Sequence, residues 1–138
     1  MKRRTAAIAS ALAVSLLGGS ASAVGPHALT DVSLALLRAY NAEDAPELHR
    51  LLASSLQTKY PVETLRRALT LCRVLTYDID RLSTPVWGGR TYGYFAVYAE
   101  AKTFEMVLEI DQDEKIVHWL LTDDLAAAEQ QCKVSHLD

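Results

Sequence analysis

Hydrophobic and polar residues divide the chain into a helical first half and a strand-rich second half. Between residues 30 and 73, apolar residues recur every three or four positions, as they do along one face of a helix. This spacing predicts helices over residues 30–41, 44–55 and 61–73. Asp44 is a good N-cap for the second of them, and a proline in a first turn loses no helical hydrogen bond.

From residue 74 onward, apolar and polar residues alternate, which is typical of half-buried strands. The alternation predicts strands over residues 74–82, 91–101, 103–111 and 116–121. It is clearest in the third strand, which is expected to turn one set of side chains to the core and another to the opposite face: Phe104, Met106, Leu108 and Ile110 against Glu105, Val107 and Glu109. The dipeptide Gly88-Gly89 predicts a tight turn between the first two strands.

Helices that precede strands in one chain are typical of the α+β class. We expect the N-terminal helices to pack on a curved four-stranded antiparallel meander, followed by a short C-terminal helix that is capped by Thr122 or Asp123 and ends near residue 131. The composition agrees, because 138 residues with 50% hydrophobic and 22% charged positions are typical of a globular protein. Residues 24–138 are predicted to form a single domain.

Residues 1–23 are predicted to be a secretory signal peptide. Basic residues at positions 2–4 precede an apolar run at 6–17, which is too short to span a bilayer as a helix. Ala21-Ser22-Ala23 supplies the small residues that signal peptidase requires, so we expect cleavage after Ala23. The segment is typical of bacterial signal peptides, which predicts a periplasmic or secreted protein. After cleavage, we expect no membrane span. The alternative is a permanent N-terminal anchor.

Charge and cysteine content narrow the possible partners. The chain has 14 basic and 17 acidic side chains, which gives a net charge of −3. The predicted signal peptide is basic, so its cleavage would leave a more acidic protein. A negative field repels phosphate, so nucleic acid and anionic membranes are poor partners. Two cysteines in an oxidising compartment predict a Cys72–Cys132 disulfide, with a reactive or metal-binding thiol as the alternative.

Several segments resemble the nuclear transport factor 2-like superfamily, specifically an exported bacterial branch of uncharacterised function. The resemblance is carried by a helix and turn at 36–44, by leucines in the next two helices, and by strand patterns at 94–100, 104–111 and 115–119. It implies a curved sheet wrapped around helices as a cone with an internal pocket. The Cys72–Cys132 pair is not a general feature of that superfamily. Its isomerase members use a tyrosine and aspartates, which have no matching motif here.

Two groups could act as an acid or base. His118, in the last predicted strand, is either a general base inside the cone or a half-buried histidine bonded to a neighbour. Asp78 and Asp80 share one strand face and are either paired catalytic carboxylates or part of an outward polar face. No serine-nucleophile, phosphate-loop or metal-binding motif accompanies them, so no cofactor and no metal is expected.

Aromatic side chains give a second candidate site. Tyr92, Tyr94 and Tyr98 share one strand face and could line a ligand pocket, form a dimer face or pack in the core. Trp87, near the glycine pair, is a candidate contact residue. The predicted set of ligand-binding or partner-binding residues comprises Trp87, Tyr92, Tyr94, Tyr98, Met106 and His118.

The sequence thus favours an exported, non-catalytic binding or accessory domain. Such a domain would hold a small apolar or amphipathic ligand in the cone, or bind an envelope protein or a second copy of itself on the open sheet face. The alternative is a small pocket enzyme, such as an isomerase, dehydratase or hydrolase, with His118 or Asp78/Asp80 as its base.

Overall fold

In the part of the chain that the structure describes, four helices come first. The computed structural model describes residues 23–137, so the predicted signal peptide lies, apart from Ala23, outside the described residues. The helices are α1 (Ala28–Asn41), α2 (Ala45–Leu51), α3 (Ser54–Lys59) and α4 (Val62–Thr76). Asp44 caps α2 as expected, because its carboxylate accepts a hydrogen bond from the Glu47 amide.

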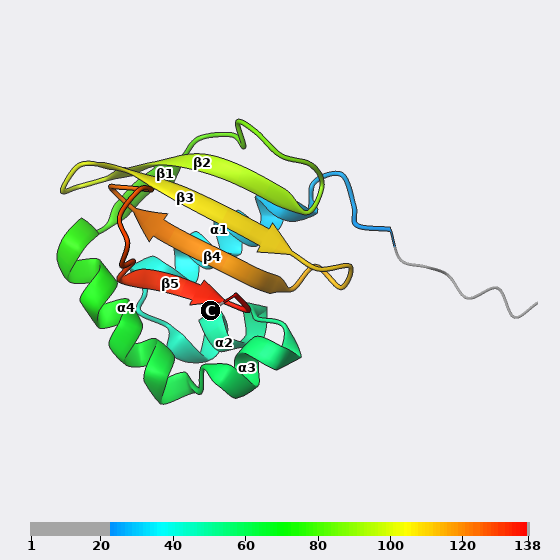
Figure 1. Cartoon of the computed structure of the whole chain (residues 1–138), viewed down its shortest axis with the longest axis horizontal. Helices are drawn as coiled ribbons and strands as arrows, with labels where there is room; N and C mark the ends of the chain where they lie inside the picture. The colour runs from blue at the N-terminus through cyan, green and yellow to red at the C-terminus, as the bar shows by residue number, and fades with distance from the viewer. Residues whose placement is uncertain (1–22, 138) are drawn as a thin grey trace, which may run out of the picture.

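The second half forms one antiparallel sheet whose strands follow one another in chain order. They are β1 (Ile79–Leu82), β2 (Tyr92–Ala99), β3 (Thr103–Ile110), β4 (Ile116–Thr122) and β5 (Cys132–Ser135). Figure 1 shows the open sheet in front, with α1 behind it and α2, α3 and α4 below and beside it. The α+β prediction is confirmed, although the sheet has five strands instead of four and does not close into a cone.

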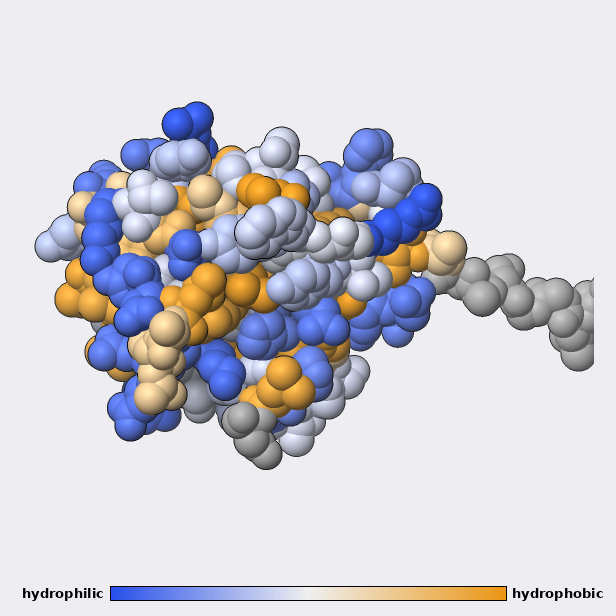
Figure 2. Space-filling view, turned by 45° about the horizontal axis from the view of Figure 1, so that its top comes forward, coloured by the Kyte–Doolittle hydropathy of each residue, from blue (hydrophilic) through white to orange (hydrophobic). Residues whose placement is uncertain are grey.

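The two faces of the sheet differ in the way that the strand alternation predicts. Phe104, Met106, Leu108 and Ile110 are all buried against the helices, whereas Glu105, Val107 and Glu109 are only partly buried. In the core, the rings of Tyr40 on α1 and Trp119 on β4 meet edge to face at 6.0 Å. The opposite face of the sheet carries both hydrophobic and hydrophilic side chains. Figure 2, an oblique view onto the β1–β2 side, shows pale and orange side chains among blue hydrophilic ones.

The predicted C-terminal helix over 122–131 is wrong. Residues 123–131 form an irregular loop, and β5 follows it. A turn begins the loop, because the Thr122 hydroxyl accepts a hydrogen bond from the Asp124 amide at 3.0 Å. The loop carries three alanines and several polar residues but no apolar stripe that a helix could bury. Cys132 and Val134 are buried instead by pairing β5 with β4.

The boundary between the last long helix and the first strand also differs from the prediction. Residues 74–76 continue α4, because the Thr76 hydroxyl is buried and hydrogen-bonded to the Tyr40 hydroxyl at 2.7 Å. Tyr77 then ends the helix with a φ of 56°. The strand begins only at Ile79, whose backbone N–H and C=O both pair with the Asn41 side chain at 2.9 Å.

A third difference concerns residues 54 and 55, where the second helix is expected to end. Ser54 instead begins α3. Ala53 just before it is extended, and its amide donates a hydrogen bond to the Ile116 carbonyl at 2.9 Å. This contact with β4 interrupts the helical path, and α3 then buries Leu56 in the core.

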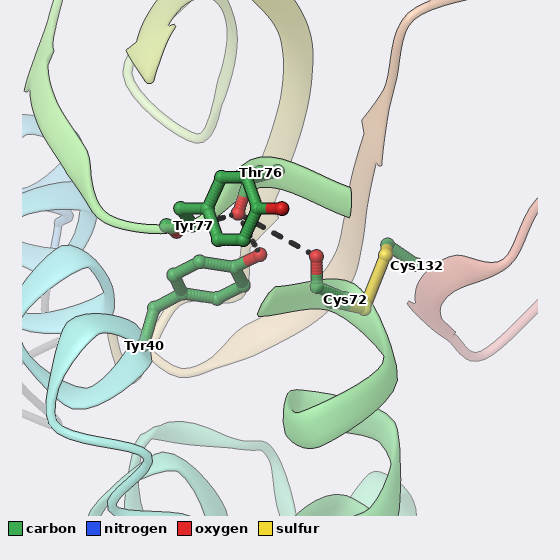
Figure 3. Close-up of a disulfide and its surroundings, with 5 residues drawn as sticks. All are labelled: Tyr40, Cys72, Thr76, Tyr77 and Cys132. Carbon is green, nitrogen blue, oxygen red and sulfur yellow. Dashed lines mark hydrogen bonds between the residues drawn. A yellow bond between two sulfur atoms is a disulfide. The ribbon is translucent and has the colours of Figure 1, made fainter. Parts of the chain in front are cut away.

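The predicted disulfide is confirmed. Cys72 on α4 and Cys132 on β5 are bonded across 60 positions of sequence, with their Cα atoms 5.6 Å apart (Figure 3). Such a bond is typical of proteins in a non-reducing, extracellular environment. None of the helices described between residues 23 and 137 is long and apolar enough to cross a membrane.

Candidate functional site

The sheet face turned away from the helices, here called the outer face, is the candidate site. It carries the side chains that alternate with the buried ones on β2, β3 and β4. Cross-strand register places Tyr92 beside Glu109 and Tyr94 beside Val107. Glu109 in turn is opposite His118 on β4. Neighbouring side chains on one face of a sheet lie within contact distance, so these residues form one continuous surface.

Aromatic rings are the main feature of the outer face. Tyr92 and Tyr98 are 42% and 37% exposed, and Trp87 from the preceding loop is 75% exposed. The Trp87 ring lies 6.1 Å from the half-buried ring of Tyr94. Of the three interpretations of the tyrosine row, packing in the core does not fit these positions, because the buried residues of β2 are Gly93, Phe95 and Val97.

The tight turn predicted from Gly88-Gly89 is present, because an antiparallel bridge pairs Gly88 with Gly93 and the Gly89 amide donates a hydrogen bond to the Tyr92 carbonyl at 2.9 Å. The segment before it, which presents Trp87, continues alongside β2. Residues 83–91 run along the edge of β2, held by hydrogen bonds such as that from the Val86 amide to the Tyr94 carbonyl at 2.8 Å. Gly88 has a φ of 130°, and a Cβ there would lie 2.0 Å from the Tyr92 carbonyl oxygen. Gly89 has open space around it. Only the first glycine is therefore required by the path that places Trp87 beside Tyr94.

Charged groups surround the rings. The Arg81 guanidinium lies 4.2 Å from the centre of the Tyr98 ring, a cation–π distance. A hydrogen bond with the Glu105 carboxylate raises the pKa of Tyr94 to about 12, because the bond requires the neutral phenol. Arg81, Glu105 and Glu109 were not singled out from the sequence, although strand alternation alone placed the two glutamates on this face.

His118 lies at the β5 side of the outer face and has a structural partner. Its Nδ1 is hydrogen-bonded to the Ser135 hydroxyl at 2.7 Å, and Ser135 is fully buried. Burial lowers the pKa of His118, and positive charge on Lys133 and His136 adds to this, while Glu109 opposes it. The Ser135 carbonyl also accepts hydrogen bonds from Lys59 and Tyr60 on or next to α3. These contacts attach β5 to its surroundings.

The predicted acid–base groups do not come together. Asp78 is ion-paired with Arg73 at the end of α4, and Asp80 is exposed on β1. The strand that holds His118 is separated from β1 by β2 and β3. Within residues 23–137, no group of histidine, cysteine and acidic side chains could hold a metal ion.

Met106 belongs to the opposite face from the aromatic residues and does not join them in one site. It is buried against the helices, where it lines a cavity of only about 10 Å³ together with Tyr40 and Trp119. That volume is about enough for one water molecule. The space around Met106 therefore offers no room for a ligand of several atoms.

Comparison of the chain with protein-family models, with curated proteins and with solved structures finds no match. The resemblance to nuclear transport factor 2-like domains therefore stays a prediction from residue patterns, and the geometry of the outer face is the main guide to function.

Proposed function

We propose that the chain is an exported, non-catalytic binding module that contacts a partner protein of the cell envelope through the outer face of its sheet. One observation carries the proposal: Trp87 and three tyrosines lie together on the face that no helix described between residues 23 and 137 covers. Tryptophan, tyrosine and arginine are the residues that contribute most to protein interfaces, and all three types are present here with Arg81.

The chemistry of the face indicates what kind of partner surface would fit. The rings offer apolar area with hydroxyl groups at their tips, which suits a protein surface with apolar and hydrogen-bonding groups. Glu105 and Glu109 lie among the tyrosines, so a partner with lysine or arginine at the matching positions is favoured. A membrane or nucleic acid with a phosphate surface would meet the same acidic side chains unfavourably.

Export is part of this proposal. It is supported by the leader pattern of residues 1–23 and by the Cys72–Cys132 disulfide, which is stable in the periplasm or outside the cell. Membership of the nuclear transport factor 2-like superfamily is a further part. Helices packed on one face of an antiparallel meander support it, whereas the small space around Met106 does not match the internal pocket that the superfamily implies.

Site-specific photocross-linking in the exporting cell tests the proposal. Benzoylphenylalanine replaces Tyr92 or Tyr98 on the outer face or, as a matched control, Leu71, which is 67% exposed on α4. We expect the same protein to be cross-linked from both tyrosine positions but not from Leu71, and Trp87→Ala to reduce the yield. No adduct from the tyrosine positions, or identical adducts from Leu71, would overturn the proposal.

A further inference from the structure

A second candidate site, a concave one, lies at the end of the sheet where β3 begins and β4 ends. Its sheet residues Phe104 and Leu121 belong to the inner face, whereas Tyr98 at the same end belongs to the outer face. The site is a half-open cavity of about 280 Å³ under the loop of residues 123–131. In Figure 1 this loop, drawn in orange to red between β4 and β5, runs beside the C-terminal end of α4. None of the residues that line the cavity belongs to the aromatic set of the outer face.

The floor of the cavity is apolar. It is formed by Phe104 and Leu121, which are the buried inner residues at the ends of β3 and β4, and by Leu75 on α4. Thr76 on α4 and Cys132 on β5 also line the cavity, and Figure 3 shows these two residues near the disulfide. An apolar floor with a few polar groups around it is the usual composition of a small-molecule site.

The loop that roofs the cavity is held in shape by its own hydrogen bonds and by its two ends. The Gln130 side-chain amide donates to the carbonyls of Asp124 and Ala127, at 2.9 and 3.2 Å. The turn at Thr122 holds one end, and the disulfide at Cys132 holds the other. A preformed wall reduces the conformational entropy that a ligand must remove when it binds.

The charges at the rim are not balanced. Lys102 is ion-paired with Asp123, and both residues line the cavity. Glu129 also lines the cavity, and its carboxylate has no ion-pair or hydrogen-bond partner among residues 23–137. The rim therefore carries one negative charge in excess next to an apolar floor.

We propose that this cavity binds a small amphipathic amine, with its apolar part on Phe104 and Leu121 and its ammonium group at Glu129. The volume limits the ligand, because drug-sized molecules occupy cavities of roughly 300–1,000 Å³ and this one lies just below that range. The site is independent of the partner-binding face proposed above, so either proposal can fail without the other.

Nuclear magnetic resonance with the isotope-labelled protein tests this site, with phenethylamine as the probe and phenylacetate as its anionic counterpart. We expect saturable shifts by phenethylamine at the amides of residues 102–104 and 121–132, and weaker binding of phenylacetate. Glu129→Gln should weaken phenethylamine binding by about threefold, the size expected for an exposed ion pair. Trp87→Ala should leave phenethylamine binding unchanged.

A pair of alanine substitutions checks that the cavity itself is the site. Ala127 lines the cavity, so Ala127→Trp should fill it and abolish the shifts, whereas Ala126→Trp places the same ring at an exposed position that does not line it. The proposal is overturned if phenethylamine produces no saturable shifts, if the shifts fall on β2 instead, or if Ala127→Trp and Glu129→Gln both bind as the natural protein does.

Discussion

At the scale of single residues, Tyr94 shows how a neighbour across the sheet changes side-chain chemistry. Its phenol is hydrogen-bonded to Glu105, and ionisation would place two negative charges side by side. The pKa is therefore raised from 10.0 to about 12, and Tyr94 remains a neutral hydrogen-bond donor at physiological pH. Because the folded-state pKa lies above the unfolded value, this contact stabilises the fold fully below pH 10 and ceases to do so as the pH rises through about 12.

Titration of phenolate absorbance should show a step near pH 12 that belongs to Tyr94, in addition to the late ionisation of the buried Tyr40, whose pKa is raised by burial. We expect Tyr94→Phe to remove this step and Glu105→Gln to shift it towards 10.0, because the carboxylate is the main cause of the shift. Glu109→Gln, on the same face beside Tyr92, serves as the control and should leave the step in place. An unchanged titration in Glu105→Gln would contradict the assignment.

At the scale of secondary-structure elements, a single side chain joins α1 to the edge of the sheet. The Asn41 amide group donates to the Ile79 carbonyl and accepts from the Ile79 amide, both at 2.9 Å. The side chain thus takes the place of a neighbouring strand at the start of β1. Arg73 donates a hydrogen bond to the Asn41 carbonyl and is ion-paired with Asp78, so α4 is held at the same junction.

Two substitutions of Asn41 should show what each of its two hydrogen bonds to Ile79 contributes. Asn41→Ala removes both and should destabilise the fold by about 1–3 kcal/mol, because it leaves backbone groups of Ile79 without partners. Asn41→Asp keeps the acceptor but loses the donor. In hydrogen exchange we therefore expect the Ile79 amide to stay protected in Asn41→Asp and to exchange faster in Asn41→Ala. Equal protection in the two variants would show that the Asn41 acceptor does not hold β1.

At the scale of the whole molecule, the disulfide connects the helical half to the last strand. It closes a loop of 60 positions, for which the chain-entropy model gives a stabilisation of roughly 4 kcal/mol. We expect a double variant, Cys72→Ala with Cys132→Ala, to melt about ten degrees or more below the natural protein, which thermal unfolding by circular dichroism measures. Prolonged reduction of the natural protein should lower its midpoint similarly and leave that of the variant unchanged. Equal midpoints for variant and natural protein would contradict this role of the disulfide.

Local sequence pattern was sufficient to predict much of the fold and to predict which residues of the candidate site share one strand face. Periodicity in residues 30–73 predicts α1, α2 and α4, and strict alternation in 103–111 separates the buried Met106 from the partly buried Glu105 and Glu109. Grouping Met106 with the tyrosines did not follow from that alternation, and the structure places them on opposite faces. These features depend on which side chains repeat along a few turns or residues, and such repeats are present in the sequence itself.

The tertiary structure alone decided the features that depend on contacts between distant segments. The strand at 132–135 exists because Cys132 is bonded to Cys72 and because β4 offers an unpaired edge. The same placement of β5 creates the cavity under residues 123–131. It also brings Ser135 into hydrogen-bonding contact with His118. The sequence by itself determined helices α1, α2 and α4, the β2–β4 meander and the strand face that the tyrosines share, since these require only local periodicity. The position of the C-terminal segment required long-range pairing, which no local pattern encodes.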